Sequence, residues 1–579
     1  MGTKKRNKRE HMNDLLFPIL CILCLMPFVV HLAEYDYGYG SYPWHSDYSV
    51  AQDLYAYYRS YFFELVAVVS LFILSLRMAI YRDKHKPSRI YLPLAVYSVF
   101  VTLSAAFSIN PRASLTGNFY QFQSIFVLSG YCLMSFYTYQ VMESEQDYQT
   151  VTKGIAVSFL LLSVSGWFQV FGHDILNLGW VQRLIMSEHQ FAEYGGSLAD
   201  VFSGNNVFLT LYNPNYAAVF LVMVTAVFAV LAFGEQQKKK RACFLLLLIA
   251  SLMLLWFTYT RAAFVALAAG TAVFALCRGK QLLRYWKYIL PGLFLLAAVF
   301  IGADAVNGFR FLSRVVDDRK DSEIEEIRTT RDGIAIVYGG RGLVLSMEEK
   351  NLLAKDEKGN PIVLEQNGAG EWLLPFHEEV AAIILDEDGE TSCMLQIEGY
   401  TLEFVRTQDG YFYRNEDGKL DKMREIPHID MHGMEYLGSG RLYIWSRVIP
   451  LLKDYMLAGS GPDTFAEAFP QDDYVGKMVY AGSARRVMEG AHNDYLTRWV
   501  QTGLASLLSL LVFYALFLKR CFTYYRSCPL GSAREKLGFG CFLACVCYLV
   551  CCLFCDSSLF TTPVFYVFAG VALAAARQE

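Results

Sequence analysis

The stretch AHNDYLTRWVQTGLAS (491–506) leads directly into the apolar run LLSLLVFYALFL (507–518). A long apolar run is typical of a helix that crosses a membrane, because about 20 apolar residues span a hydrocarbon core of ~30 Å. His492 and Asn493 stand at the entrance to this run. An imidazole costs more free energy there than a leucine would, so we expect His492 to have a hydrogen-bonding partner or a chemical role.

Apolar runs of this kind recur along the whole chain. Its 579 residues are 54% hydrophobic and only 18% charged, whereas a soluble globular domain carries about 25% charge. The runs are continuous and not alternating, which favours helices as the spanning structures. We therefore predict an all-α polytopic membrane protein with about twelve transmembrane helices and an inserted, extracytoplasmic, small β-rich domain. The predicted spans cover residues about 14–34, 61–81, 91–109, 121–141, 153–173, 215–234, 242–260, 262–277, 288–305, 495–518, 537–555 and 559–576.

Lysine and arginine in the short loops predict the orientation of these spans. With twelve spans and an N-terminus inside, every basic segment falls on the cytoplasmic side. These segments are MGTKKRNKR (1–9), RDKHKPSR (82–89), KKKR (238–241), CRGKQLLRYWK (277–287) and LKRCFTYYRS (518–527). We expect a multi-pass protein of the cytoplasmic membrane with both termini in the cytoplasm, and with residues 35–60, 174–214 and 306–494 outside. The first span is too long for a signal peptide and lacks a cleavage site.

The outer segment differs in composition from the rest of the chain. Residues 317–437 carry 28 Asp and Glu against 13 Lys and Arg, so we expect this part to stand off the membrane. Turn signals such as DEDGE (386–390) separate short runs rich in β-branched and aliphatic residues, for example IAIVY (334–338). This spacing predicts an antiparallel meander of about six strands. An amphipathic helix and a loop follow, and they lead to His492.

Four regions result from this pattern. We predict an N-terminal transmembrane bundle of about nine helices over 1–305 and an extracytoplasmic β-rich insert over 306–437. An extracytoplasmic amphipathic helix with a catalytic loop is predicted for 438–494, and about three transmembrane helices for 495–579.

The positions of the cysteines predict neither disulfides nor metal sites. Of fourteen cysteines, only Cys393 falls in the large outer segment, where a single thiol has no partner for an internal disulfide. The run CFLACVCYLVCCLFC (541–555) lacks the His or Asp partners and the loop setting of a zinc site, so we interpret these thiols as small packing residues. We predict no metal and no cofactor. The chain also has no G-x-x-x-x-G-K-[ST] motif, and we expect no nucleic-acid partner.

Three ionisable residues at predicted membrane faces are candidates for chemistry. Arg261 lies in FTYTRAAF, Arg441 in SGRLYIW, and His492 before the tenth span. Taken singly, each has a structural alternative: an arginine that extends to lipid phosphates, an interfacial arginine beside Trp445, and a histidine paired with a backbone carbonyl at a helix start. Asn493 and the aspartate after it likewise suit helix caps.

Together the three residues are more informative. Two permanent cations and one titratable base are predicted on the same membrane face. Guanidinium groups match phosphate oxygens with forked, charge-assisted hydrogen bonds, and a nearby imidazole could take a proton from an attacking hydroxyl. This set favours glycosyl transfer from a lipid diphosphate.

The late motif resembles that of the O-antigen ligase family, bacterial membrane proteins that include lipopolysaccharide O-antigen ligases and related polymerases. In that family, His followed by Asn, Ser or Gln, nine residues and Gly-x-x-Gly opens a late span. Here His492, Asn493 and Gly503 match this pattern, and Ser506 stands at the last glycine.

Other segments resemble the same family in order and spacing. The family's Ser/Thr-Arg at an outer helix end is similar to Thr260–Arg261, and its Gly-Arg-x-x-x-Trp is similar to Gly440–Arg441 through Trp445. The remaining matches are Gly459, Gly461, Thr464 and Phe465 in LAGSGPDTF (457–465), and Asn213 and Asn215 in LYNPNYAAVFL (211–221). For the asparagines we favour a helix N-cap with proline in the first turn. The insert over about 317–437 is larger than this family leads us to expect.

The resemblance implies an inverting, metal-independent glycosyltransferase with its active site on the outer face of the membrane. Arg261 and Arg441 would bind the diphosphate of an undecaprenyl-diphosphate-linked glycan, with Arg485 and Arg486 as weaker contacts. His492 would act as general base on an acceptor hydroxyl of a glycan, lipid or protein. The paired aspartates at 317–318 and 472–473 are interpreted as solvated loop charges.

Two alternatives stay open at this level. The same scaffold serves surface polysaccharide polymerases and protein O-oligosaccharyltransferases, and the sequence does not choose between their acceptors. A lipid-linked glycan flippase or transporter is the other alternative, since twelve spans are common among transporters. However, the chain shows no two related halves, and its charged candidates are predicted at the outer face and not at mid-membrane.

Overall fold

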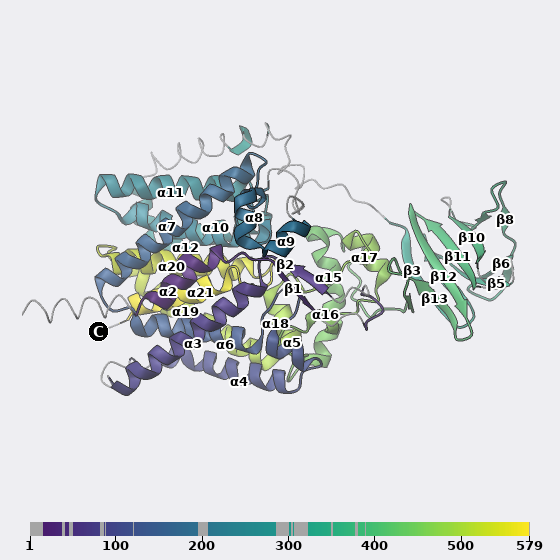
Figure 1. Ribbon diagram of the computed structural model, residues 1–579, viewed down its shortest axis with the longest axis horizontal. Helices are drawn as coiled ribbons and strands as arrows, with labels where there is room; N and C mark the ends of the chain where they lie inside the picture. Colours follow the sequence, from purple (N-terminus) through teal and green to yellow (C-terminus); the bar gives the residue numbers. More distant parts are fainter. Residues whose placement is uncertain are drawn as a thin grey trace, which may run out of the picture.

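The computed structural model describes residues 15–36, 41–45, 50–80, 86, 88–119, 121–194, 206–284, 300–302, 305, 322–348, 351–376, 380–387 and 390–577. It has a bundle of long helices at one end and a β-rich domain at the other (Figure 1). The C-terminus lies at the end of the bundle that is far from the β domain. A mostly helical protein with a separate β-rich region is therefore confirmed.

Six described helices are long and apolar enough to cross a membrane. They are α3 (Tyr57–Ile80), α4 (Leu92–Ala106, preceded by the turn η4, Arg89–Tyr91), α7 (Glu145–Val170), α10 (Pro214–Gly234), α12 (Arg261–Arg284) and α19 (Leu504–Ser527). Three apolar helices are shorter: Phe17–Phe28, which comprises α2, η1 and η2, then α6 (Ile125–Val141) and α21 (Thr562–Ala575). The total of about twelve spans stays a prediction. The span predicted at 288–305 lies outside the described residues apart from 300–302 and 305.

Helix α10 is the centre of the bundle. In its most apolar window 89% of the residues are buried, against 28% in α3 and in α4. It packs against α11 (Lys238–Trp256) and α20 (Ala533–Cys551). A Cβ at Gly540 would lie 3.0 Å from the Cα of Val227, so a small residue lets α10 and α20 approach closely. The apolar side chains exposed on α3 and α4 form the face expected to meet lipid.

The shorter elements lie mainly at the end of the bundle nearest the β domain. The helices and turns are α5 (Pro111–Thr116), η5 (Ile175–Asn177), α8 (Gly179–Ile185), α9 (Glu188–Tyr194), α15 (Leu437–Leu451), η6 (Leu452–Tyr455), α16 (Phe465–Ala468), α17 (Tyr474–Ala481) and α18 (Asp494–Thr502). A two-stranded antiparallel sheet of β1 (Ala33–Asp36) and β2 (Val50–Asp53) accompanies them.

The insert contains two antiparallel meanders among its described residues, where the sequence predicted one of about six strands. The first is β3 (Ile324–Thr329), β4 (Ile334–Tyr338), β5 (Arg341–Glu348), β6 (Asn351–Asp356) and β7 (Pro361–Ile362). The second is β8 (Glu365–Gln366), β9 (Trp372–Leu373), β10 (Ala381–Glu387), β11 (Glu390–Ile397), β12 (Tyr400–Thr407), β13 (Gly410–Arg414) and β14 (Leu420–Asp421). Residues alternate between buried and partly exposed along β4, and both sheets contribute to one hydrophobic core.

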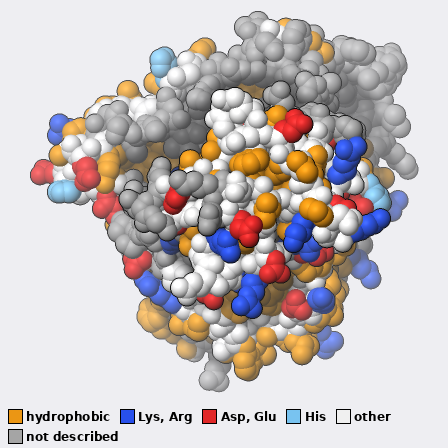
Figure 2. Space-filling model, turned by 90° about the vertical axis from the view of Figure 1, so that its right-hand side faces the viewer, with side chains coloured by type: hydrophobic (Ala, Val, Ile, Leu, Met, Phe, Trp, Pro, Cys, Tyr) orange, Lys and Arg blue, Asp and Glu red, His pale blue; other side chains and the backbone are white. Residues whose placement is uncertain are grey.

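The β domain is joined to the rest of the protein by side-chain contacts as well as by the chain. Tyr474 and Met478 of α17 belong to the hydrophobic core of the β domain. The Tyr474 hydroxyl donates to Asp421 Oδ2 at 2.7 Å, and Asn415 Nδ2 donates to the carbonyl of Pro43 at 2.7 Å. The domain therefore packs on the segment that leads to His492 and on the N-terminal loop at residues 41–45. Acidic and basic side chains lie intermingled on this end of the molecule (Figure 2).

The predicted helix over 495–518 is wrong in one respect. Residues Asp494–Thr502 form a separate short helix, α18, and α19 begins at Leu504. Gly503 separates them with a φ of +84°, and a Cβ there would lie 2.3 Å from the carbonyl oxygen of Leu457. Only glycine accepts both the conformation and the close approach. His492 therefore precedes a short polar helix and does not open the long apolar one.

Candidate active site

His492 is held against a buried carboxylate from the C-terminal part of the chain. Its ring Nδ1 lies 3.4 Å from Asp556 Oδ2, and its backbone N–H donates to the same oxygen at 3.0 Å. The Thr497 hydroxyl donates to the other oxygen, Oδ1, at 2.5 Å. The Asp556 side chain is 3% exposed and the His492 side chain 43% exposed. The carboxylate thus fixes the ring, and no described residue forms a hydrogen bond with Nε2.

The charge state of Asp556 suits this role. Burial by itself would raise the pKa of this carboxyl, but hydrogen bonds from His492 and Thr497 and the charge of the imidazolium lower the pKa below its ordinary value. An ionised carboxylate at Nδ1 keeps the proton on that nitrogen and leaves Nε2 as an acceptor. The pair can therefore remove a proton from a hydroxyl placed at Nε2.

The segment around His492 is fixed by a buried polar network. Asn493 caps α18 by accepting the N–H groups of Tyr495 and Leu496 at 3.1 and 3.3 Å, as predicted for a helix cap. Asp494 is not a cap, since its carboxylate pairs with Arg498 Nε at 3.2 Å. Arg498 also donates to Gln123 at 2.7 Å and to the hydroxyl of Ser557. These contacts join α18, the start of α6 and the loop that carries Asp556.

Arg441 reaches the same loop from α15. Its Nε donates to the carbonyl of Phe554 at 2.9 Å, and its Nη1 donates to the carbonyl of Gly438 at 2.6 Å. Phe554 is two residues from Asp556, so at most roughly 7 Å of backbone separates the Arg441 and His492 contacts on this loop. One turn along α15, Trp445 Nε1 donates to the carbonyl of Ala491 at 2.8 Å. Helix α15 therefore supports the loop of His492 and places a guanidinium beside it.

Arg261 is the first residue of α12 and joins this group through the entry to α15. Its Nη2 lies 3.4 Å from the Ser439 hydroxyl, and Ser439 is two residues before Arg441. The turn at 438–440 has a positive φ at all three residues, and a Cβ at Gly440 would lie 2.7 Å from the Tyr480 carbonyl. The structure thus brings the two arginines and the histidine into one region through Ser439, Phe554 and Asp556.

The asparagine motif supports Arg261 indirectly. Asn213 caps α10 by accepting the N–H of Tyr216 at 3.0 Å, the role favoured from the sequence. Asn215 Oδ1 accepts the Thr260 hydroxyl at 3.3 Å. Thr260 directly precedes Arg261, so this contact fixes the point at which α12 begins.

The motif glycines and Ser506 serve close packing. A Cβ at Gly459 would lie 2.4 Å from the carbonyl oxygen of Gln501, and one at Gly461 would lie 2.1 Å from the Ser108 hydroxyl. Ser506 is fully buried, and its hydroxyl donates to Thr502 at 2.8 Å. The small side chain at this position therefore lies within a tight contact between α18 and α19.

Arg485 and Arg486 have different surroundings. Arg485 Nη2 donates to Asp417 at 2.6 Å, so its guanidinium contacts the β domain. Arg486 Nη1 donates to the carbonyl of Ala481 at 3.2 Å, and its charge lies close enough to Glu489 to act on that carboxyl. Burial nevertheless raises the pKa of Glu489 well above its ordinary value. Of the two arginines, Arg486 is the one that electrostatics places near the His492 segment.

One aspartate of this region was missed in the sequence, and another was misinterpreted. Asp556 is the only acidic residue between positions 536 and 578, in a chain segment of two apolar helices, and such an isolated charge is a functional signal. Asp472 and Asp473 were interpreted as solvated loop charges, but Asp473 is buried and pairs with Arg447 at 2.8 Å. The doublet at 317–318 lies outside the described residues. In the described ranges, no group of three or more His, Cys, Asp and Glu residues could hold a metal ion.

Asp463 gives the loop between Gly461 and Thr464 a pH-dependent stability. Its Oδ2 accepts the N–H groups of Asn118 and Gln123 at 2.6 and 2.9 Å, and burial raises the pKa of this carboxyl from 3.8 to about 7. Because folding raises this pKa, the contribution of the Asp463 side chain to the free energy of unfolding is complete below pH 3.8 and is lost progressively as the pH rises to about 7.

Replacing Asp463 by asparagine should therefore remove this pH dependence. The amide keeps an oxygen that accepts both N–H groups but carries no charge at any pH. We expect the melting temperature of wild-type protein to fall relative to Asp463→Asn between pH 5 and pH 8, measured on the full chain in detergent. Melting temperatures that change in parallel with pH for the two proteins would contradict the raised pKa of Asp463.

Comparison with known proteins supports the motif analysis. A family model described as O-Antigen ligase matches residues 417–511, which include α15, α18 and His492. No curated protein and no solved structure matches the chain. Over 417–511 the match confirms the resemblance drawn from the motifs, and it supports a likeness of this chain to an O-antigen ligase-like family.

Proposed function

We propose that this protein transfers a glycan from an undecaprenyl-diphosphate carrier to an acceptor hydroxyl on the outer face of the cytoplasmic membrane. The observation that carries the proposal is the pairing of His492 with buried Asp556 beside Arg441. Neither Arg261 nor Arg441 has a carboxylate partner among the described residues, whereas Arg447 and Arg498 do. Two guanidinium groups without a counter-charge next to a general base suit an anionic donor and a hydroxyl acceptor.

The proposed transfer needs only the lipid-linked donor and the acceptor hydroxyl as reactants. His492 Nε2 takes the proton of the acceptor hydroxyl as its oxygen attacks the anomeric carbon. The bond between that carbon and the diphosphate oxygen breaks, and the lipid diphosphate leaves. Arg261 and Arg441 stabilise the negative charge that grows on this leaving group. Attack from the face opposite to the diphosphate inverts the anomeric configuration.

Polymerases and protein O-oligosaccharyltransferases differ from a ligase only in the acceptor that supplies the hydroxyl. The family match supports a ligase- or polymerase-type enzyme and leaves the acceptor to experiment. Reconstituted vesicles with a lipid-linked glycan separate these enzymes from a flippase. Release of lipid diphosphate with transfer of the glycan supports the proposal, and movement of an uncleaved donor across the bilayer would refute it.

Removing either guanidinium should impair the chemical step. We expect Arg441→Ala and Arg261→Ala to lower kcat/KM for donor cleavage by about 10²-fold each, because each loses a preorganised charge at the leaving group. Arg441→Lys should recover only part of this loss, since an ammonium cannot donate in the forked geometry. Release of lipid diphosphate from a defined donor is the measurement.

Arg183→Ala is the matched control for these variants. Arg183 is exposed on α8, where its guanidinium lies 4.5 Å from the centre of the Phe191 ring. This variant should behave as wild type. Full activity of both Arg261→Ala and Arg441→Ala at normal protein levels would overturn the assignment of the arginines.

A further inference from the structure

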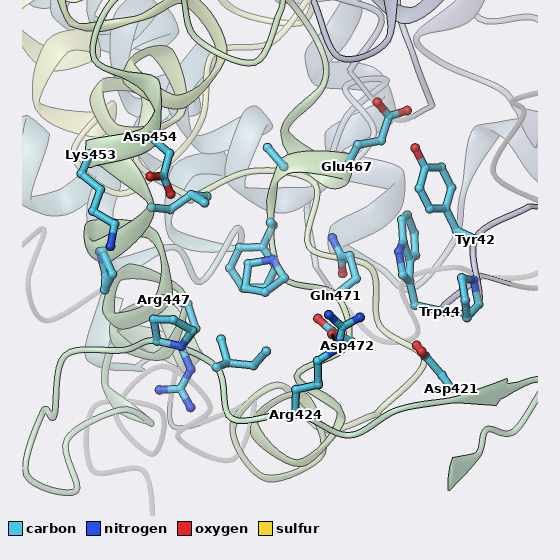
Figure 3. A pocket seen from close by; sticks show the side chains of 18 residues that line it. Tyr42, Trp44, Asp421, Arg424, Arg447, Lys453, Asp454, Glu467, Gln471 and Asp472 are labelled. Carbon is cyan, nitrogen blue, oxygen red and sulfur yellow. Dashed lines mark ion pairs between the residues drawn. The ribbon is translucent and has the colours of Figure 1, made fainter. Parts of the chain in front are cut away.

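We propose that the cavity between residues 41–45, β14 and α15 binds a saccharide segment of a glycan, as a subsite of the transfer reaction proposed above. The cavity has a volume of about 470 Å³, within the range of small-molecule sites. Tyr42 and Trp44 stand on one side of it, Arg447 and Lys453 on the opposite side, and Arg424 and Asp472 between them (Figure 3).

The aromatic side offers a surface for a pyranose ring. The rings of Tyr42 and Trp44 stack with centroids 4.9 Å apart and planes inclined by 27°. The β domain positions them: Asn415 Nδ2 donates to the Pro43 carbonyl at 2.7 Å, and Lys419 Nζ donates to the Tyr42 carbonyl at 3.3 Å. The C–H groups on one face of a sugar pack against such rings, because aromatic side chains combine a large apolar area with few rotatable bonds.

The polar side suits a neutral ligand rich in hydroxyl groups. Four acidic and three basic side chains line the cavity, so it favours neither a free anion nor a free cation. Most of these charges already have partners within the protein. The contacts are Arg447 to Asp473 at 2.8 Å, Arg424 to Asp472 at 3.4 Å, Tyr474 to Asp421 at 2.7 Å and Asn110 to Glu467 at 2.6 Å.

These partners leave hydrogen-bonding capacity unused. A carboxylate has about four acceptor positions and a guanidinium has five N–H donors, so each pair can also bind sugar hydroxyl groups. A sugar hydroxyl group both donates and accepts hydrogen bonds. It therefore binds best where fixed donors and acceptors lie side by side.

A second cavity adjoins the first one. It has a volume of about 360 Å³ and shares Arg424, Ile426, Arg447 and Asp472 with the first. The shared residues form the boundary between the two spaces. The two adjoining cavities, hereafter called the groove, together offer room for an oligosaccharide.

Two structural links connect this groove to His492. On α15, Arg441 and Trp445 are one turn apart and face the His492 loop. Arg447 points roughly 120° away from Arg441 and roughly 160° away from Trp445 around the helix, and it lines the cavity. Gln471 is buried at the cavity and exchanges hydrogen bonds with the backbone of Met488 at 2.8 and 3.1 Å, four residues before His492. A glycan held in the groove would thus lie against the elements that position the general base.

Binding can be tested separately from catalysis. The full chain in lipid nanodiscs is examined by saturation-transfer NMR with two oligosaccharide probes from the source cells. One is released by mild acid from the lipid-linked precursor, and the other is recovered from the surface of a deletion strain and is therefore unmodified acceptor. We expect wild type and His492→Ala to bind one of these probes equally well. The probe that binds identifies the donor or the acceptor as the source of the saccharide.

Substitutions at the groove should weaken this binding. Trp44→Ala and Arg424→Ala are each expected to raise the Kd by about tenfold or more, and Trp44→Phe should retain most of the affinity because it keeps an aromatic face. Arg424 is 68% exposed, so its substitution tests the groove without disturbing the core. Lys358→Ala, in an exposed turn of the β domain, is the control. In turnover assays the groove variants should raise KM with little change in kcat.

Two results would overturn the proposal that the groove binds a saccharide. One is wild-type protein that binds neither probe, and the other is unchanged affinity in both Trp44→Ala and Arg424→Ala. Failure of the transfer proposal gives a different result. In that case His492→Ala would keep the full turnover of the wild-type protein, while the groove variants would still bind the oligosaccharide probe more weakly.

Discussion

Replacing His492 by alanine is expected to lower turnover by a factor of about 10²–10⁴ while donor binding is retained, because a positioned general base contributes to the chemical step and not to diphosphate affinity. In cells, a deletion strain complemented with His492→Ala should lack one surface glycan and accumulate its lipid-linked precursor. Compositional analysis of surface glycans together with quantification of the precursor checks both statements.

The control for this variant is His189→Ala. His189 lies on α9 with a side chain 88% exposed, and its only described partner is Glu193, one turn away. This variant should restore the glycan fully. Normal glycan attachment in the His492→Ala strain, at wild-type protein levels, would show that another group removes the proton.

Replacing Asp556 by asparagine is expected to reduce kcat by about 10²–10⁴, although Asp556 itself touches no substrate. The amide can still accept one of the hydrogen bonds from the His492 backbone and Thr497. However, its NH₂ group facing Nδ1 would favour the tautomer with the proton on Nε2, where it blocks uptake of the acceptor proton. The pH dependence of this loss distinguishes a positioning residue from a packing residue.

The pH profile provides the second readout for Asp556. An imidazolium beside a neutral amide loses its counter-charge, so the acid limb of the activity profile of Asp556→Asn should move to lower pH. A purely structural defect would lower activity at every pH without moving this limb. Asp409→Asn, at an exposed turn of the β domain, is the matched control and should leave both activity and profile unchanged.

The sequence was sufficient to find the individual chemical groups. Short local patterns identified Arg261, Arg441 and His492 as candidates. Each of these ionisable side chains stands at the end of an apolar segment, where a charge costs free energy unless it is paired. Local patterns also predicted the cap at Asn493 and the antiparallel strands of the insert, because capping and alternation depend on neighbours within a few residues. The break at Gly503 was not found, because an apolar run looks continuous until its φ and the nearby Leu457 carbonyl are known.

Tertiary structure alone decided which groups lie together. Asp556 is 64 residues from His492 in the chain, and Phe554 is 113 residues from Arg441. Trp44 likewise lines the same cavity as Arg447 and Asp472 because the β domain holds the N-terminal loop. Local sequence fixes which residues carry charge and where a helix begins. Contacts between distant segments depend on how whole helices and sheets pack, and no pattern within a few residues of His492 or Trp44 records that packing.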